Sequence, residues 1–294
     1  MKVRHAVIMA AGTSSRFAPL SYEKPKALLE VRGEILIERQ IEQLMLAGVP
    51  SIVVVTGYKA EMLDYLKDKY PVRLIHNADY RTRNNHGSLY AARDWLCESY
   101  ICSADNYFAV NPFEEDVPSA YYAVVYAEGE TDEWCVRTNK SGVITGVTIG
   151  GHDAWVMMGH AYFDQLFADQ FVKILENEYD DAATRSLFWE DIYLNHIDAL
   201  TMKARQYGAG VIAEFDSIDE LRVFDPSYVA NTRSPIIRRI AASLGCSESD
   251  IRGMSPLKDD TGDVIGFQFT ALDGGYAYRY RDAAILPVGE ARGL

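Results

Sequence analysis

Apolar and polar residues follow two alternating patterns along the first 104 residues. Short, nearly continuous apolar runs are typical of buried strands in a parallel sheet, and they lie at 5–11, 51–58, 72–77 and 100–104. Three segments between them carry apolar residues at helical spacing and predict helices at 35–49, 59–70 and 87–99. Strands that alternate with helices predict an α/β fold: a Rossmann-like mixed, mainly parallel sheet with helices on both faces.

Beyond residue 118 the pattern becomes rich in strand-forming residues. Two segments, 119–128 and 133–151, have this character, and the second contains the polar turn NKSG at 139–142. They predict hairpins added to the main sheet. A helical pattern returns at 162–200, and the last strand and helix of this part are predicted at 211–217 and 218–225.

The segment after residue 225 is predicted to form a separate piece, so that the domains are 1–225 and 226–294. Residues 226–235 resemble a linker, and a helix at 234–246 and a hairpin at 265–282 follow. About 60 residues make only a marginal core alone. We therefore expect this small α+β appendage to pack on the main domain or on a second subunit, and to contribute stability or assembly, not chemistry.

Composition and charge argue against several classes of protein. The net charge of −13 over 294 residues disfavours a nucleic-acid-binding surface, which needs a basic face. No apolar run approaches the roughly 20 residues of a membrane helix, and the N-terminal run is too short for a signal peptide. The four cysteines show neither a C-x-x-C pair nor zinc-ligand spacing. We expect reduced thiols in a cytoplasmic protein that binds neither nucleic acid nor membrane.

The stretch IMAAGTSSRFAPLSYEKPKALL, at 8–29, gathers small residues and cations in this acidic chain. The small residues leave room where the chain turns out of its first strand, so that the backbone N–H groups of residues 11–15 can surround phosphate oxygens. Arg16 can bind terminal phosphates through two hydrogen bonds, and Lys26 can place a charge on the reacting phosphorus. An ordinary surface turn with solvated cations is the alternative, which the full length of the pattern disfavours.

This motif resembles that of nucleotidyltransferases, which couple a nucleoside triphosphate to a phosphorylated small molecule and release pyrophosphate. Together with YRTRNNHGSLYAARD, YICSADNYF, TDEW and VIAEFDSIDEL, it looks most like bacterial phosphocholine cytidylyltransferases, and the resemblance extends across residues 1 to about 225. It implies CTP as donor, CDP-choline as product and Mg²⁺ as cofactor. It also implies in-line attack of a substrate oxygen on the α-phosphorus, with Arg16 and Lys26 as the catalytic cations.

Two acidic positions match the metal ligands of that family. Asp105 follows the strand predicted at 100–104, and Asp216 closes the strand predicted at 211–217. Ligands bind at such strand ends in open α/β sheets, and Mg²⁺ prefers a few hard oxygen ligands combined with phosphates. A helix cap or turn is the alternative for either residue alone. Glu214 is a candidate for a further ligand or for a partner of one.

The resemblance also implies a nucleotide-binding set. Its members lie in the opening motif, around the start of the helix predicted at 87–99, and at the end of the strand predicted at 100–104. Asn84 and Ser88 are predicted to contact the pyrimidine edge and the ribose, since an amide offers both a donor and an acceptor; capping is an equal alternative for Asn85. The set is Ala10, Ala11, Gly12, Thr13, Ser14, Ser15, Asn84, Ser88 and Ala104.

A trimethylammonium acceptor needs aromatic faces and a nearby carboxylate. The predicted acceptor-binding residues are Asp105, Tyr107, Trp134, Trp189 and Asp191. Trp155 is a further aromatic candidate, and Glu133 and Glu190 are further acidic neighbours. For any one tryptophan, core packing is the commoner role.

Several alternatives stay open. 2-Aminoethylphosphonate is the nearest rival acceptor, a sugar 1-phosphate is a more distant one, and an inactive nucleotide-binding scaffold is an alternative of another class. A homodimer is a further expectation. The tail resembles the first helix and hairpin of bacterial choline kinases, with Arg279 about where the ATP-binding lysine would lie. No catalytic lobe follows, so we expect no kinase activity.

Overall fold

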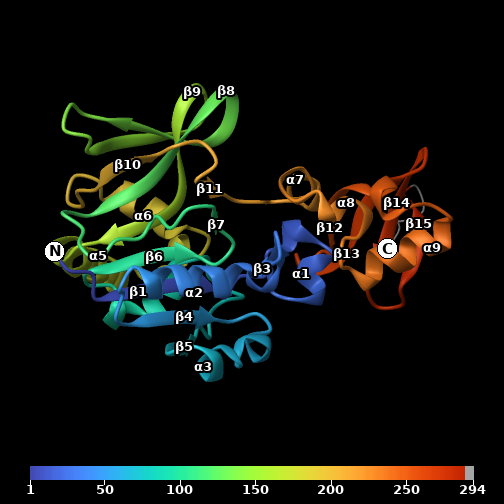
Figure 1. Cartoon of the computed structure of the whole chain (residues 1–294), viewed down its shortest axis with the longest axis horizontal. Helices are drawn as coiled ribbons and strands as arrows, with labels where there is room; N and C mark the ends of the chain where they lie inside the picture. Colours follow the sequence, from blue (N-terminus) through green and yellow to red (C-terminus); the bar gives the residue numbers. More distant parts are fainter. Residues whose placement is uncertain (289–294) are drawn as a thin grey trace. The chain divides into compact units, whose positions relative to one another are not determined.

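The structure is a computed structural model and describes residues 1–288. The chain forms two compact units. Unit 1 comprises Met1–Gly12 and Leu36–Glu214, and unit 2 comprises Thr13–Ile35 together with the chain from Phe215 onward. Figure 1 shows the blue α1 (Leu20–Glu23) next to orange and red elements of the same unit. The division differs from the predicted boundary at residue 225, since residues 13–35 belong with the C-terminal part.

Unit 1 is built on a mixed sheet that, within residues 1–288, has seven strands in the order β10-β8-β9-β6-β1-β4-β5. β1 runs parallel to β4 and β6, β4 to β5, and β8 to β10, whereas β9 is antiparallel to β6 and β8. The predicted mainly parallel sheet is thereby confirmed. The strands are β1 His5–Ala10, β4 Ile52–Thr56, β5 Val72–His76, β6 Ser99–Ser103, β8 Tyr121–Thr138, β9 Ile144–Phe163 and β10 Lys203–Tyr207.

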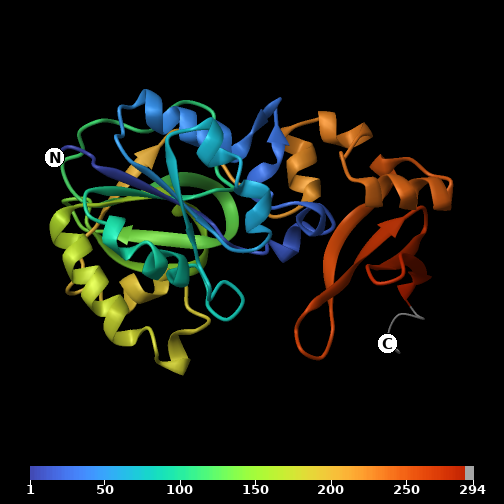
Figure 2. The same cartoon turned by 90° about the horizontal axis from the view of Figure 1, so that it is seen from below.

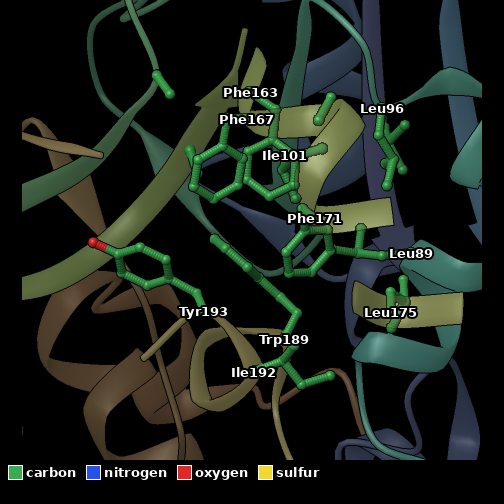
Figure 3. Packing of buried hydrophobic residues seen from close by; sticks show 14 of the residues in the cluster. Leu89, Leu96, Ile101, Phe163, Phe167, Phe171, Leu175, Trp189, Ile192 and Tyr193 are labelled. Carbon is green, nitrogen blue, oxygen red and sulfur yellow. The ribbon is translucent and has the colours of Figure 1, made fainter. Parts of the chain in front are cut away.

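Helices cover both faces of this sheet. α4 (His86–Ala91), α5 (Gln165–Glu178) and α6 (Trp189–Asn195) pack on one face, where their apolar side chains meet those of β1, β4, β6 and β9 in one hydrophobic core. Figure 3 shows Phe163, Phe167, Phe171 and Trp189 interlocked there. α2 (Leu36–Leu46), blue in Figure 2, lies on the opposite side of the sheet from the yellow-green α5.

Two predicted helices are shorter than expected. The segment 59–70 forms a 3₁₀ turn, η3 (Ala60–Leu63), and the single turn α3 (Leu66–Lys69), and it begins at Lys59 with a left-handed φ of 50°. The segment 87–99 is helical only to Ala91, with a 3₁₀ turn η4 (Arg93–Trp95) after it. Glu98 has a φ of 47°, which a right-handed helix does not accommodate. Apolar spacing alone does not reveal these backbone reversals.

The predicted hairpin is present and longer than expected. β8 and β9 pair around the turn at 139–142, where the amide of Gly142 donates to the Asn139 carbonyl over 3.0 Å. The Asn139 side chain also accepts hydrogen bonds from the amides of Ser141 and Val143. The last predicted strand of this part is reduced to the two residues of β11 (Ile212–Ala213), which pair with β7 (Tyr107–Phe108).

Unit 2 combines short elements from both ends of the chain. Those of residues 13–35 are η1 Ser15–Phe17, α1 Leu20–Glu23, η2 Lys26–Leu28, β2 Glu30–Val31 and β3 Glu34–Ile35. Those of the C-terminal part are α7 Ile218–Phe224, α8 Ser227–Ala230, α9 Pro235–Leu244, η6 Glu248–Asp250, β12 Arg252–Lys258, β13 Val264–Ala271, β14 Gly274–Arg279 and β15 Ala284–Pro287. The four strands of this last part form an antiparallel sheet within the described chain.

The tail is thus more structured than a helix and a hairpin. Its predicted linker contains α8, and the predicted helix spans α9 and ends at Gly245, whose φ is 67°. Ile237, Ile240, Phe267 and Phe269 are all buried within the described chain. None of the helices in residues 1–288 is both long enough and apolar enough to cross a membrane.

Candidate functional site

The opening motif begins at the carboxyl end of β1, in unit 1. Ala10 and Ala11 are buried, and the Ala11 carbonyl accepts a hydrogen bond of 3.0 Å from the amide of Tyr58, just after β4. On the other side, the amide of Ala104, just after β6, donates to the Met9 carbonyl over 3.1 Å. The loops that follow three neighbouring parallel strands therefore meet here, at the sheet edge where α/β proteins bind ligands.

Gly57 permits this close approach. A Cβ added to Gly57 would lie 2.8 Å from the Cβ and the carbonyl oxygen of Ala11 and 2.8 Å from the Cβ of Tyr80. Any side chain would displace the backbone that carries the motif. Gly57 directly follows β4, and the apolar pattern of the predicted strand 51–58 gives no sign of this role. Gly12, in contrast, is exposed, with open space around its α-carbon.

The two predicted catalytic cations lie in unit 2, together with one predicted metal ligand. Arg16 Nη1 is 2.7 Å from Asp216 Oδ2, and Lys26 Nζ is 3.9 Å from Asp216 Oδ1. The Lys26 side chain is only 5% exposed, and its ammonium lies 5.4 Å from the centre of the Phe17 ring. A buried ammonium requires an anionic partner, and Asp216 supplies one. The structure therefore gathers the two predicted cations around the carboxylate of one predicted metal ligand.

The rest of the opening motif is accessible to ligands. Thr13 is exposed, and Ser14 and Ser15 are partly exposed. Ser14 has a left-handed φ of 47° and precedes η1, and its carbonyl accepts from the amide of Phe17 over 2.9 Å. This reversal starts the 3₁₀ turn that carries Arg16.

A second set of predicted residues lies in unit 1, where β7 pairs with β11. Asp105 follows β6 and is partly exposed. Ala213 pairs with Tyr107, and the Asn106 side chain donates to Glu214 Oε2 over 3.0 Å. Glu214 therefore lies beside residues 105–107. Tyr107 itself is only 6% exposed.

Asn84 and Ser88, predicted to bind nucleotide, make internal hydrogen bonds in unit 1. Asn84 Nδ2 donates to the Ser186 carbonyl over 3.0 Å, and Ser88 Oγ accepts from Asn77 Nδ2 over 3.3 Å. Ser88 is buried. In this structure both side chains fix the loop before α4, and their predicted contacts with nucleotide stay predictions.

Glu190, which the sequence offered only as a further acidic neighbour of the acceptor site, makes two side-chain hydrogen bonds. Its Oε1 accepts from the Tyr122 hydroxyl and its Oε2 from Asn85 Nδ2, each over 3.1 Å. Burial raises the pKa of Glu190 to about 7, against hydrogen bonds that favour the carboxylate. The Tyr122 pKa is raised as well, by burial and then by Glu190, Glu214 and Asp105. Glu190 contacts this hydroxyl, and Glu214 and Asp105 act on it through their charge; we call the three carboxylates the acidic cluster.

Two of the predicted acceptor-binding residues have structural roles here. Asp191 Oδ2 accepts from the Phe188 amide over 2.7 Å and so caps α6. Trp189 is 1% exposed in the hydrophobic core, where its ring stacks on that of Tyr122 with 5.6 Å between centroids. Trp134 is only partly buried and meets the exposed Phe188 edge to face, with ring centroids 6.1 Å apart. Trp134 and the further candidate Trp155 are both partly exposed, whereas Trp189 is fully buried.

Carboxylates are the groups that the chain offers to a metal ion. Among the residues that the structure describes, no three His, Cys, Asp or Glu side chains converge to form a metal site. Mg²⁺ bound mainly through substrate phosphates needs only one or two protein carboxylates. Asp105 in unit 1 and Asp216 in unit 2 are hard oxygen donors of this kind, so the residue types fit Mg²⁺.

Comparison with known proteins adds independent findings. A family model described as a MobA-like NTP transferase domain matches residues 6–128. The 2-aminoethylphosphonate cytidylyltransferase of Lancefieldella rimae is 37% identical over 235 residues, which cover 78% of this chain and 95% of that protein. The choline-phosphate cytidylyltransferase of Streptococcus pneumoniae is 33% identical over 217 residues, covering 74% of this chain and 95% of that protein. A solved structure of the CTP:phosphocholine cytidylyltransferase of the same species has a TM-score of 0.73 at 32% identity, and covers 77% of this chain and 99% of that one.

Proposed function

Because the chain belongs to the MobA-like nucleotidyltransferases and, within them, to the cytidylyltransferase family, we propose that it transfers CMP from CTP to a phosphorylated or phosphonylated amine. Pyrophosphate is the second product. The observation that carries this proposal is the group formed by Arg16, Lys26 and Asp216, in which two cations of the signature motif share one carboxylate. Such a group suits a triphosphate, which brings its own negative charge and competes with Asp216 for the cations.

The reaction requires no nucleophile from the protein. An oxygen of the acceptor's phosphate or phosphonate, already anionic, forms a bond to the α-phosphorus of CTP. The bond from that phosphorus to the bridging oxygen breaks, and pyrophosphate leaves with its electron pair. Arg16 and Lys26 stabilise the charge that develops on the leaving phosphates, because preorganised cations act most strongly where water is excluded. Lys26 is buried and so meets this condition.

Mg²⁺ is the proposed cofactor. Asp105 in unit 1 and Asp216 in unit 2 are each a candidate ligand for it. When bound, the ion neutralises charge on the triphosphate.

The acidic cluster supports an amine in the acceptor. Glu190, partly buried with a pKa raised to about 7, gains a compensating charge when an ammonium binds beside it. A primary ammonium donates hydrogen bonds that carboxylates accept, whereas a trimethylammonium needs exposed aromatic faces. With Trp189 in the core, the geometry favours 2-aminoethylphosphonate. Phosphocholine, the acceptor expected from the sequence, is the second candidate, supported by Trp134 and Phe188.

An acceptor panel tests the proposal. Purified protein with Mg²⁺ and CTP is given 2-aminoethylphosphonate, phosphoethanolamine, phosphocholine or glucose 1-phosphate, and pyrophosphate release is followed. We expect release with at least one amine and a preference for primary ammonium compounds. Preference for phosphocholine would reverse the choice of amine. Absence of release with every acceptor would overturn the function in favour of an inactive nucleotide-binding scaffold.

A further inference from the structure

The signature motif is divided between the two units. Ala10, Ala11 and Gly12 belong to unit 1, whereas the chain from Thr13 to Ile35, with Arg16 and Lys26, belongs to unit 2 with the C-terminal elements. The contacts within unit 2 show what holds this segment, which we call the cation loop, residues 13–35.

One anchor is the carboxylate of Glu23, at the end of α1. Its Oε1 accepts hydrogen bonds from Ser234 Oγ over 2.8 Å and from the amide of Ile236 over 3.0 Å. Both donors lie at the N-terminus of α9, where Ser234 also caps the helix by accepting from the Ile237 amide. A carboxylate is favoured at this end of a helix, because the helix dipole and the first amides attract negative charge. Glu23 thus ties the cation loop to α9.

A second anchor lies at β2 and the turn after it. The hydroxyl of Tyr228, a fully buried residue, donates to the Glu30 carbonyl over 2.7 Å, and the amide of Arg32 donates to Asp225 Oδ2 over 2.7 Å. The Arg32 guanidinium also lies 3.8 Å from the centre of the Phe224 ring. Together these contacts join the end of the cation loop to α7 and α8.

A third anchor is aromatic. Tyr22 of α1 stacks on Tyr280, which follows β14, with ring centroids 3.6 Å apart and an interplanar angle of 6°. β12 of the same sheet also lies against η1, the turn that carries Arg16. The C-terminal sheet therefore supports the cation loop directly beneath its catalytic arginine.

Asp216, the partner of Arg16, is anchored to the same C-terminal elements. It lies directly before Ser217, which caps α7. Farther along α7, the buried Arg222 donates to the carbonyls of Ile251 and Glu248 over 2.7 and 2.6 Å. Both members of the Arg16–Asp216 pair are thus attached to the elements that end the chain.

We propose that the C-terminal elements from α8 to β15 position the cation loop for CTP, and that Glu23, which α9 holds in place, is the residue within the loop that positions Arg16 and Lys26. This inference rests on the proposed function, in which these cations bind CTP. It also revises the expectation that the tail serves stability or assembly alone.

The test uses the full chain and a double-mutant cycle. Glu23→Ala should lower kcat/KM for CTP at least tenfold, with the KM for the acceptor within twofold. Glu23→Gln, whose amide oxygen still accepts both hydrogen bonds, should restore kcat/KM to within about threefold of the wild type. Glu61→Ala, at an exposed position in η3 of unit 1, is the matched control and should change neither parameter.

The Arg16→Ala background separates positioning from simple loss of stability. If Glu23 acts by positioning Arg16, adding Glu23→Ala to Arg16→Ala should lower kcat/KM for CTP by less than about threefold. The reason is that substitutions of residues that act as a unit have non-additive effects. An unchanged tenfold effect would overturn the proposal. If Glu23→Ala does not fold, as judged by circular dichroism, Tyr280→Ala enters the same cycle from the tail side.

A second measurement does not depend on turnover. Lys26 is 5% exposed, so trypsin should cleave after it slowly in the wild type and at least fivefold faster in Glu23→Ala or Tyr280→Ala, but not in Glu61→Ala. Equal cleavage rates in all these proteins would overturn the inference. A wild type without CTP turnover, combined with the expected cleavage pattern, would refute the proposed function and leave the anchoring of the loop intact.

Discussion

The raised pKa of Glu190 can be tested directly by substitution. Burial raises its pKa from the ordinary 4.5 to about 7. The change to test is Glu190→Gln, which removes the titration and retains the shape of the side chain. It keeps one acceptor, for the Tyr122 hydroxyl, and loses the acceptor that faces Asn85 Nδ2.

The size of the effect follows from the shift. A difference of 7 − 4.5 = 2.5 pKa units corresponds to about 3 kcal/mol, since each unit is about 1.4 kcal/mol. Between pH 4.5 and 7 the folded protein holds a proton that the unfolded chain has released. The contribution of Glu190 to the free energy of unfolding therefore falls as pH rises through this window. Because Glu190 is partly exposed, solvent screening makes about 3 kcal/mol an upper bound.

Urea unfolding at pH 5 and pH 8 measures this contribution. The free energy of unfolding of Glu190→Gln, minus that of the wild type, should be more positive at pH 8 than at pH 5, by up to about 2.5 kcal/mol, because part of the contribution is already lost at pH 5. The hydrogen bond to Asn85 that the variant loses changes its free energy of unfolding about equally at the two pH values. It therefore does not affect the comparison between pH 5 and pH 8. A difference that does not change with pH would refute the reasoning from burial.

The same variant tests the role of Glu190 in binding the amine. An ammonium ligand favours the ionised carboxylate, so the wild-type KM for the acceptor should fall from pH 6 to pH 8, through the pKa of about 7. The acceptor's own phosphate or phosphonate titrates identically in assays of both proteins. Glu190→Gln is therefore the control, and its acceptor KM should lack the part of the pH dependence that comes from Glu190. Equal pH profiles for the two proteins would exclude Glu190 from the amine site.

Substitutions of single residues in the two units test the proposed roles of their side chains. Lys26→Ala should lower kcat about 10²–10³-fold, as for other preorganised charges, and a loss of less than fivefold in steady-state assays would exclude it from catalysis. Asp105→Asn and Asp216→Asn should each nearly abolish turnover with unchanged circular dichroism, and Mg²⁺ titration should show weaker activation. Trp189→Ala should lower the free energy of unfolding by about 3–5 kcal/mol in urea, whereas a pure rise in the acceptor KM would indicate a ligand-binding role. Gly57→Ala should cost about 1–3 kcal/mol from overpacking, and a melting temperature equal to that of the wild type would contradict the close approach.

Local sequence patterns predict the fold of unit 1 well. The apolar runs at 5–11, 51–58 and 100–104 correspond to β1, β4 and β6, because strands buried on both faces need continuous apolar residues. Unit 2 was not predictable in this way. Its key contact joins Glu23 to Ser234, which are 211 positions apart, and no local pattern records such a pairing. The boundary at residue 225 followed from composition, which does not report long-range contacts.

Long-range contacts that the sequence does not record also determine single residues of the candidate site. Arg16, Lys26 and Asp216 were predicted from motifs, and the structure brings them together. Glu190 and Asp191 are adjacent acids at the start of α6, and sequence alone does not show which one turns inward. The hydrogen bonds from Tyr122 and Asn85 to Glu190 decide it. Both partners are more than 60 residues away from Glu190 along the chain.

The composition of unit 2 has a consequence for the order in which the protein is made. Residues 13–35 leave the ribosome well before the elements that hold them, which begin at Phe215. The intervening 214 − 35 = 179 positions take about 10–40 s to synthesise at about 5–20 residues per second. During that time the sheet of unit 1 can form on the nascent chain, whereas Arg16 and Lys26 lack their support. A newly made chain should therefore gain the ability to bind nucleotide only after the elements that begin at Phe215 have been synthesised.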